Sequence, residues 1–152
     1  MGGTRRGGRF QRTLASSLPA LEAACCDLRA YLQARDVGDA SFCAELVARE
    51  LLNNAVLHGN ALDTAKTVEL ELAVGWRWIT IRVTDEGAGF DWRAACRRPL
   101  EDTSATHGRG LAICRTYGRH LTYRLGGRQA LVRLLRHAVP TEERNDGSGL
   151  HD

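Results

Sequence analysis

Residues 50–59 read ELLNNAVLHG, a predicted helical stretch that carries polar side chains where apolar ones are expected. At about 100° per residue, Asn54 lies roughly 40° and His58 roughly 80° from Glu50, on a face whose other members are apolar. Burying a carboxylate costs several kcal/mol unless it is paired or bound. The stretch therefore favours a functional site, with an internal ion pair for Glu50 and a helix-end role for His58 as the alternatives.

Regular patterns on both sides of this stretch predict the order strand, helix, helix, hairpin, long loop, helix and hairpin. The predicted helices are 17–32, 39 or 41 to 58, and 110–117, and the predicted strands after the second helix are 68–74, 79–84, 120–125 and 130–137. Ser17 with Pro19 starts the first helix, and Glu45 and Arg49 are assigned to the solvent side of the second. Helices on one face of a mainly antiparallel sheet form an α/β two-layer sandwich.

Length and composition predict one globular domain. The chain has 152 residues, of which 43% are hydrophobic and 26% charged, and this is enough to form a single core. The predicted domain covers about 9–139, between disordered tails at 1–8 and 140–152. No apolar run approaches the roughly 18 residues of a membrane span, and the start of the chain does not resemble a signal peptide, so we expect a cytoplasmic protein without membrane contact.

The positive charge is concentrated at one end of the sequence. There are 21 basic and 18 acidic residues, and four of the arginines fall in the first twelve positions, which leaves 17 basic against 18 acidic residues for the rest. A near-neutral body argues against direct nucleic-acid binding, which requires a basic face within the fold. The 5 cysteines are odd in number and have no CxxC spacing, which indicates reduced, mostly buried thiols.

The strand predicted over 79–84 leads into a carboxylate followed by glycines. Because side chains alternate along a strand, Asp85 shares the inward face of that strand. The segment DEGAGF continues with Gly87, Gly89 and Phe90, and glycines let a backbone approach a ligand closely. Asp85 is therefore a candidate acceptor for an amino group such as that of adenine. The alternative is a turn that Asp85 merely caps.

Glycines also precede the third predicted helix. Gly108, Arg109, Gly110 and Leu111 lead into it, and the free N–H groups at a helix entrance attract phosphate. A single GxG is weak evidence for such a site. The sequence has neither a GxxxxGK[ST] loop nor a GxGxxG fingerprint, so P-loop and Rossmann nucleotide sites have no support.

In combination, these segments resemble the GHKL ATPase superfamily of gyrase, Hsp90, histidine kinases and MutL. ELLNNAVLHG matches the N box, DEGAGF the first glycine box, and HGRGLAI, residues 107–113, the second. The resemblance covers about residues 9–137 and is strongest to the anti-sigma-factor serine kinases, single-domain regulators of partner-switching pathways. It implies the Bergerat, or histidine-kinase-like ATPase, fold, with a mainly antiparallel mixed sheet covered on one face by helices.

The resemblance implies roles for individual residues. Glu50 would be the general base that takes the proton from an attacking serine hydroxyl, and Asn54 would ligate the Mg²⁺ that bridges the ATP phosphates. Asp85 would bind the adenine amino group, and 91–107 would be the ATP lid. Arg109 would face the phosphate charge unless it is simply solvated. The implied nucleotide-binding residues are Asn54, His58, Asp85, Gly87, Gly89, Phe90, Gly108, Arg109, Gly110 and Leu111.

Two positions depart from the pattern of these relatives. Relatives usually follow a glycine in the last strand with a threonine that helps bind adenine, whereas this chain has Gln129 and Ala130. Some relatives also place an arginine two residues before the second glycine box, where this chain has Thr106. Because Ala130 lacks a hydroxyl group, we expect weaker nucleotide binding than in relatives with the threonine.

The implied activity is that of a serine/threonine protein kinase. It would phosphorylate a serine of a small STAS-domain anti-anti-sigma protein with ATP and Mg²⁺, and sequester a sigma factor or another regulatory target. Two alternatives remain: a non-catalytic module that binds ATP or a partner, and a detached histidine-kinase ATPase module. Trp76 and Trp78 are predicted on the outer face of the sheet, where they would anchor a homodimer unless the turn folds one of them inward.

Overall fold

The computed structural model describes residues 8–38, 40–91, 93 and 118–137. The predicted tails, apart from Gly8, most of the predicted lid and the predicted helix 110–117 lie outside these residues. The described elements are β1 (Gly8–Ala15), α1 (Leu18–Ala34), α2 (Ala40–Asn53), the π-helical segment η1 (Asn54–Gly59), β2 (Thr67–Val74), β3 (Trp78–Thr84), β4 (Gly118–Arg124), the 3₁₀ turn η2 (Leu125–Gly127) and β5 (Gln129–Leu135). Within the described residues, the predicted order of elements is confirmed.

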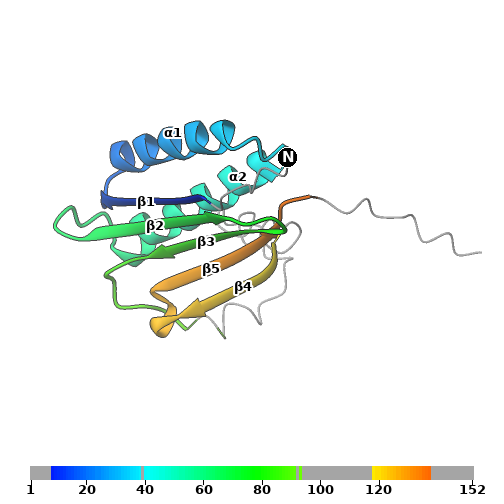
Figure 1. Ribbon diagram of the computed structural model, residues 1–152. Helices are drawn as coiled ribbons and strands as arrows, with labels where there is room; N and C mark the ends of the chain where they lie inside the picture. Colours follow the sequence, from blue (N-terminus) through cyan, green and yellow to red (C-terminus); the bar gives the residue numbers. More distant parts are fainter. Residues whose placement is uncertain (1–7, 39, 92, 94–117, 138–152) are drawn as a thin grey trace, which may run out of the picture.

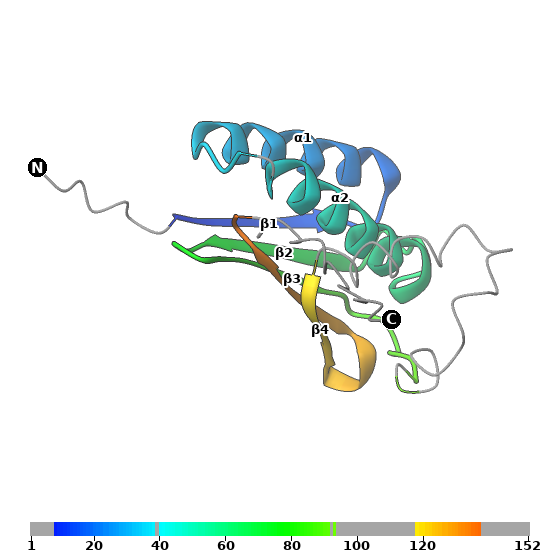
Figure 2. The ribbon, with the colours of Figure 1, turned by 90° about the vertical axis from the view of Figure 1, so that its right-hand side faces the viewer.

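The strands form one five-stranded sheet in the order β1-β2-β3-β5-β4. Every described pairing is antiparallel, whereas the resemblance implied a mixed sheet. Helices α1 and α2 lie on the same side of this sheet, as two perpendicular views show (Figure 1, Figure 2). Contacts of α1 with β1 and of α2 with β3 and β5 hold the layers together. The fold is therefore the predicted two-layer α/β sandwich.

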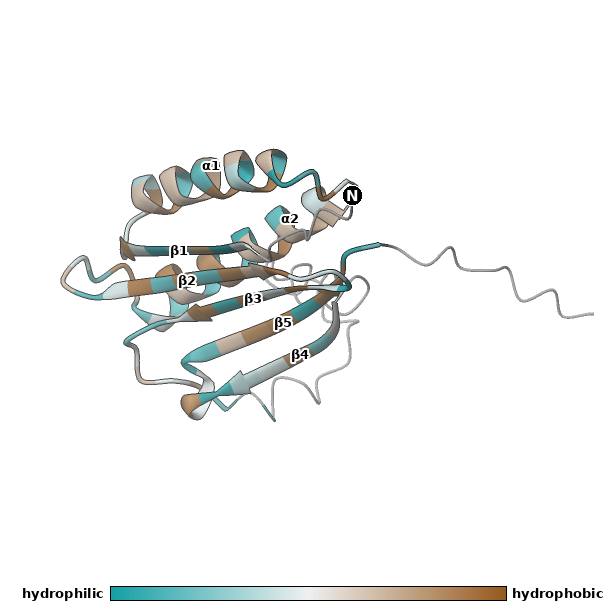
Figure 3. Ribbon diagram, viewed as in Figure 1, coloured by the Kyte–Doolittle hydropathy of each residue, from teal (hydrophilic) through white to brown (hydrophobic). Residues whose placement is uncertain are grey.

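Alternating side chains form the core side of the sheet. Polar and apolar residues succeed one another along the central strands (Figure 3). The buried aliphatic residues of β2, β3 and β5 are Val68, Leu70, Leu72, Val74, Ile79, Ile81, Val83, Val132 and Leu134. Each fully buried side chain of this kind stabilises the fold by about 1.5–3 kcal/mol. A shift of the strand pairing by one residue would move all buried side chains of that strand to the outer face. The alternating pattern therefore fixes the register of the pairing.

Helix α1 begins where the sequence predicts. Ser17 is its N-cap, and the Ser17 Oγ accepts a hydrogen bond from the Ala20 N–H at 3.3 Å. Pro19 lies in the first turn, where no backbone donor is needed. The buried side of the helix consists of Leu21, Ala24, Cys25, Leu28 and Leu32. This side agrees with the predicted spacing of three and four residues.

The buried face of α2 differs from the predicted one. It consists of Ala40, Ala44, Val47, Ala48, Leu51 and Leu52, which leaves Glu50 half-buried at the edge of this face. Glu45 and Arg49, assigned to solvent, form ion pairs with Arg29 and Glu22 of α1. The prediction is wrong on this point because it considered only one packed side, whereas α2 contacts both the sheet and α1.

The two tryptophans of the β2–β3 hairpin lie at the surface. Trp76 is 83% exposed in the turn, and the Gly75 N–H donates to the Trp78 carbonyl oxygen at 2.8 Å to close that turn. Trp78 is half-buried on the outer face, with the Arg133 guanidinium 4.6 Å from its ring centroid. The turn therefore folds neither tryptophan into the core. The predicted place on the outer face of the sheet is confirmed for Trp78, whereas Trp76 lies in the turn.

The described cysteines are free thiols, as predicted. They are Cys25, Cys26 and Cys43. Cys25 is buried, Cys43 is half-buried and Cys26 is exposed, so the expectation of mostly buried thiols holds for only one of the three. The other two cysteines lie outside the described residues.

Candidate functional site

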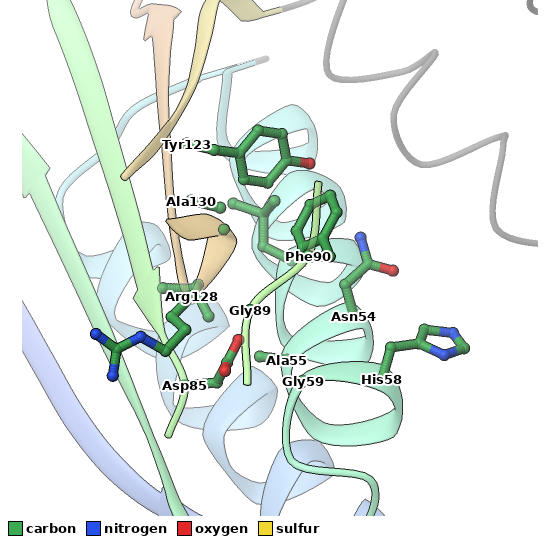
Figure 4. A pocket seen from close by; sticks show the side chains of 13 residues that line it. Asn54, Ala55, His58, Gly59, Asp85, Gly89, Phe90, Tyr123, Arg128 and Ala130 are labelled. Atoms are coloured by element: carbon green, nitrogen blue, oxygen red, sulfur yellow. The ribbon is translucent and has the colours of Figure 1, made fainter. Parts of the chain in front are cut away.

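A cavity of about 220 Å³ lies between the end of the second helix, the end of β3 and the β4–β5 hairpin. It is lined by Leu51, Asn54, Ala55, His58, Gly59, Val83, Asp85, Gly89, Phe90, Tyr123, Gly127, Arg128 and Ala130. The helix supplies one wall and the strands with their loops supply the other (Figure 4). Segments that are distant in the sequence therefore meet at one site.

The helical wall changes its winding at the cavity. Helix α2 passes directly into the π-helical η1, and the Asn60 N–H donates to the Ala55 carbonyl oxygen, five residues earlier, at 2.8 Å. The wider π turn displaces side chains from their α-helical positions, and such segments are frequent at functional sites. Asn54 and Gly59 line the cavity, while His58 is exposed at its rim.

Asp85 is the acidic side chain of the cavity lining. Its Oδ1 accepts a hydrogen bond from the Gly87 N–H at 2.8 Å. A Cβ atom on Gly59 would lie 2.4 Å from the Asp85 Oδ2, so the end of the helix touches the carboxylate. Burial raises the pKa of Asp85 above its ordinary value, while the Gly87 hydrogen bond and the charges of Arg128 and Lys66 lower it. Within the described part of the chain, the Gly87 N–H bonds to Oδ1, which makes Oδ2 the candidate acceptor for a ligand.

Two glycines of the DEGAGF segment allow close backbone contacts. A Cβ atom on Gly87 would lie 1.9 Å from the Gly59 carbonyl oxygen. Gly89 has a φ of +79°, and a Cβ atom there would lie 2.2 Å from the Gly126 carbonyl oxygen. Both positions therefore require glycine. They hold the loop after β3 between the helix end and the β4–β5 hairpin.

An aromatic pair closes part of the cavity. The ring centroids of Phe90 and Tyr123 are 5.1 Å apart and the rings are nearly perpendicular, at 83°. Ala130 pairs with Tyr123 on one side and Val83 on the other, so the position where relatives carry the threonine does belong to the site. Sequence reasoning missed Tyr123, although alternation along β4 places it on the same face as Leu121.

The β4–β5 hairpin contributes two more residues that no motif indicated. Gly127 and Arg128 line the cavity. The Arg128 carbonyl oxygen accepts a hydrogen bond from the Asp85 N–H at 2.9 Å, and its guanidinium points away from the helical wall (Figure 4). Arg128 therefore holds the backbone of the segment after β3, residues 85–90, in place, and it adds positive charge near the carboxylate. This segment is called the acidic loop below.

The fold brings together six of the ten residues in the predicted nucleotide-binding set. Asn54, His58, Asp85, Gly89 and Phe90 line the cavity, and Gly87 lies directly beside the carboxylate. Glu50, one helical turn before Asn54, is not part of the lining. The remaining predicted residues, Gly108, Arg109, Gly110 and Leu111, lie outside the described residues, as does Thr106.

The lining suits a flat ring that carries an amino group. The cavity, called the slot from here on, is lined mostly by apolar groups, and its Asp85 carboxylate can orient a bound ring. The described residues include no group of three or more His, Cys, Asp or Glu side chains that would hold a metal by themselves. The Asn54 carboxamide oxygen nevertheless fits Mg²⁺, because this ion usually keeps most of its water and phosphate ligands and takes few from the protein.

Comparison with known proteins places the sequence in one family. The sequence model described as the histidine kinase-like ATPase domain matches residues 14–136, a span that includes every residue of the cavity lining. No curated protein matches the chain. Among the described helices, none has the length and apolar character needed to cross a membrane.

Proposed function

The chain belongs to the histidine kinase-like ATPase domain family, and we propose that it binds ATP with Mg²⁺ in this cavity and transfers the γ-phosphoryl group to a serine or threonine of a protein partner. The domain implies ATP binding and ATP-related activity. The observation that carries the proposal is the convergence of Asn54 and Asp85 on one cavity, the first from the helix and the second from the glycine loop.

Adenine recognition follows from the acidic loop. The ring lies in the slot, and its amino group donates a hydrogen bond to the Asp85 Oδ2. Leu51 and Val83 offer apolar surface to the ring, and the Phe90–Tyr123 pair closes the slot. Since Ala130 lacks a hydroxyl group, the affinity depends more strongly on Asp85 than it would in a protein with two polar contacts to the base.

The phosphate end of the nucleotide lies toward Asn54. Its carboxamide oxygen would hold Mg²⁺, which when bound neutralises part of the phosphate charge. Glu50 lies one helical turn before Asn54, outside the slot and half-buried. A base for an incoming hydroxyl belongs at the γ-phosphate and not at the ring, so this position is compatible with the proposed role. Glu50 takes the proton of the serine hydroxyl, and the serine oxygen bonds to the γ-phosphorus. The bond between the γ-phosphorus and the bridging oxygen breaks, and ADP leaves with that oxygen.

The proposed partners come from the anti-sigma-factor kinase branch. The phosphoryl acceptor is a serine of a small STAS-domain anti-anti-sigma protein, and a sigma factor or another regulatory target is sequestered. Exposed Trp76 and half-buried Trp78 supply an apolar surface for a homodimer. All of these interactions are proposed to take place in the cytoplasm, where the free thiols of the described cysteines stay reduced.

Phosphoryl transfer from labelled ATP to a STAS-domain partner tests the proposal. We expect Glu50→Gln to slow transfer by about 10²–10⁴-fold with ATP affinity nearly unchanged, because Glu50 does not line the slot. Glu45→Gln is the matched control, since Glu45 is on the same helix but pairs with Arg29 of α1. Transfer that is equally fast in the wild type and Glu50→Gln would contradict the role of Glu50, and absence of any transfer by the wild type would contradict the kinase activity.

A non-catalytic module is the second candidate. The missing hydroxyl at Ala130 favours it. Such a module binds its partner but transfers no phosphoryl group. The same assay combined with a partner-binding measurement separates the two: binding without transfer supports the module.

A further inference from the structure

The Asn60 side chain makes three hydrogen bonds next to the cavity without lining it. It is 1% exposed. Its Nδ2 donates to the Ser16 Oγ at 2.7 Å and to the Thr67 carbonyl oxygen at 2.9 Å. Its Oδ1 accepts from the Glu86 N–H at 2.9 Å. One buried carboxamide therefore joins the end of β1, the start of β2 and the acidic loop after β3.

The hydrogen bond between the Glu86 N–H and the Asn60 side chain holds the acidic loop directly next to Asp85. Glu86 lies between Asp85, which meets the ligand, and Gly87, whose N–H donates to the Asp85 Oδ1. On the other side, the Asp85 N–H donates to the Arg128 carbonyl oxygen. Two successive backbone N–H groups are thus held, one by the Arg128 carbonyl oxygen just before β5 and one by the Asn60 side chain. Together they fix the carboxylate relative to the helix end.

The backbone around Asn60 needs such anchoring. The next two residues, Ala61 and Leu62, have φ values of +51° and +58°, a region that costs non-glycine residues energy and persists only where the surroundings enforce it. Ser16, 0% exposed, continues the network because its Oγ donates to the Lys66 carbonyl oxygen at 2.9 Å. The chain reversal after the helix is therefore tied to the strands through Asn60.

We propose that Asn60 is a positioning residue for base recognition: it fixes the Glu86 peptide so that the Asp85 carboxylate is oriented to select a base with an amino group. An asparagine suits this position because it supplies one acceptor and two donors in a single plane. The inference rests on the proposed function, in which Asp85 meets the adenine amino group. Asn60 itself does not touch the nucleotide.

The test compares binding of ATP and of purine riboside triphosphate, which lacks the 6-amino group. We expect the wild type to prefer ATP by about tenfold or more. Asn60→Ala should reduce this preference to about threefold or less, whereas Ser16→Ala should leave it within about twofold of the wild type. A loss of folded protein weakens the apparent binding of both nucleotides equally. The ratio of the two dissociation constants therefore reports the positioning of Asp85 and not the stability of the variant.

A second variant should lower the stability of the protein without changing the positioning of Asp85. Asn60→Asp keeps an acceptor for the Glu86 N–H but loses both donors, so we expect lower stability with the ATP preference retained. Equal preferences in Asn60→Ala and the wild type would overturn the proposal, as would an equal loss in Asn60→Ala and Ser16→Ala.

Amide hydrogen exchange tests the same bond without a nucleotide. The Glu86 and Gly87 amides of the wild type and of Ser16→Ala should exchange slowly, and in Asn60→Ala they should exchange at least about tenfold faster. If Asn60→Ala does not fold, fast exchange of the Glu86 amide in the wild type would still refute the proposal. A wild type with slow exchange but without ATP preference would contradict base recognition by Asp85 and overturn the role of Asn60 together with it, whereas fast exchange with ATP preference would overturn the role of Asn60 alone.

Discussion

Replacing the Asp85 carboxylate with a carboxamide of the same shape should abolish discrimination between nucleotides that have and lack a 6-amino group. The two oxygens of Asp85 have separate duties: Oδ1 accepts from the Gly87 N–H at 2.8 Å, and Oδ2 is left for the ligand. Asn has only one oxygen. If that oxygen keeps the Gly87 N–H, an NH₂ group faces the amino group of adenine, and in the flipped orientation the NH₂ group faces the Gly87 N–H. One donor is unpaired in either case.

The expected loss follows from the bond that disappears. A hydrogen bond to a charged group contributes about 1.5–3 kcal/mol, so Asp85→Asn should weaken ATP binding by about 10–150-fold. Purine riboside triphosphate makes no such bond and should bind the variant and the wild type with similar affinity. Isothermal titration calorimetry with both nucleotides, in the presence of Mg²⁺, measures the difference. An equal loss for both nucleotides would refute the reasoning, because it would assign Asp85 a role in folding and not in base recognition.

Three further results are expected. Burial raises the pKa of Asp85, and the stability contributed by a group with a raised folded pKa is lost as the pH rises through that pKa. At pH 7, thermal unfolding should therefore show that Asp85→Asn is more stable than the nucleotide-free wild type. Below about pH 4, where Asp85 is protonated in both the folded and the unfolded state, the two proteins should be equally stable. Gly87→Ala, whose Cβ would lie 1.9 Å from the Gly59 carbonyl oxygen, should lower the free energy of unfolding in urea by about 1–3 kcal/mol; an unchanged value would contradict this contact. In light scattering, the wild type should have twice the 16.7 kDa mass of the chain, and Trp76→Ala with Trp78→Ala should have the single mass; a double variant that remains dimeric would contradict the tryptophan interface.

The parts of the fold that sequence predicts well depend on local periodicity. Alternation in β2 and β3 and the Ser17 cap of α1 involve neighbours along the chain, and the structure confirms them. The buried face of α2 depends on a second helix that its own sequence does not identify. Glu45 and Arg49 look solvent-facing in a helical projection, and they are satisfied instead by charges on α1.

The same division applies to the candidate site. Asp85 and Asn54 are recognisable because each is a polar residue in an apolar pattern, and both reach the cavity. Tyr123 reaches it through the predicted β4–β5 hairpin, whose place beside β3 the sequence does not specify. The predicted second helix ends at His58, and Gly59 and Asn60 directly after it are typical helix stop residues. The buried side chain of Asn60 acquires a further role only when β1, β2 and the acidic loop converge on it.

The nucleotide-free site is stable in spite of Asp85 and not because of it. Burial of the Asp85 carboxylate disfavours its charge. Two further constraints lie close by: Gly87 leaves no room for a side chain, and the reversal after Asn60 contains two non-glycine residues with left-handed backbone. An adenine amino group would offset the first of these costs by giving the buried charge a donor. Nucleotide binding should therefore raise the melting temperature more in the wild type than in Asp85→Asn, although the empty variant melts higher at pH 7. A larger ligand-induced increase in the variant would show that the charge of Asp85 does not contribute to binding.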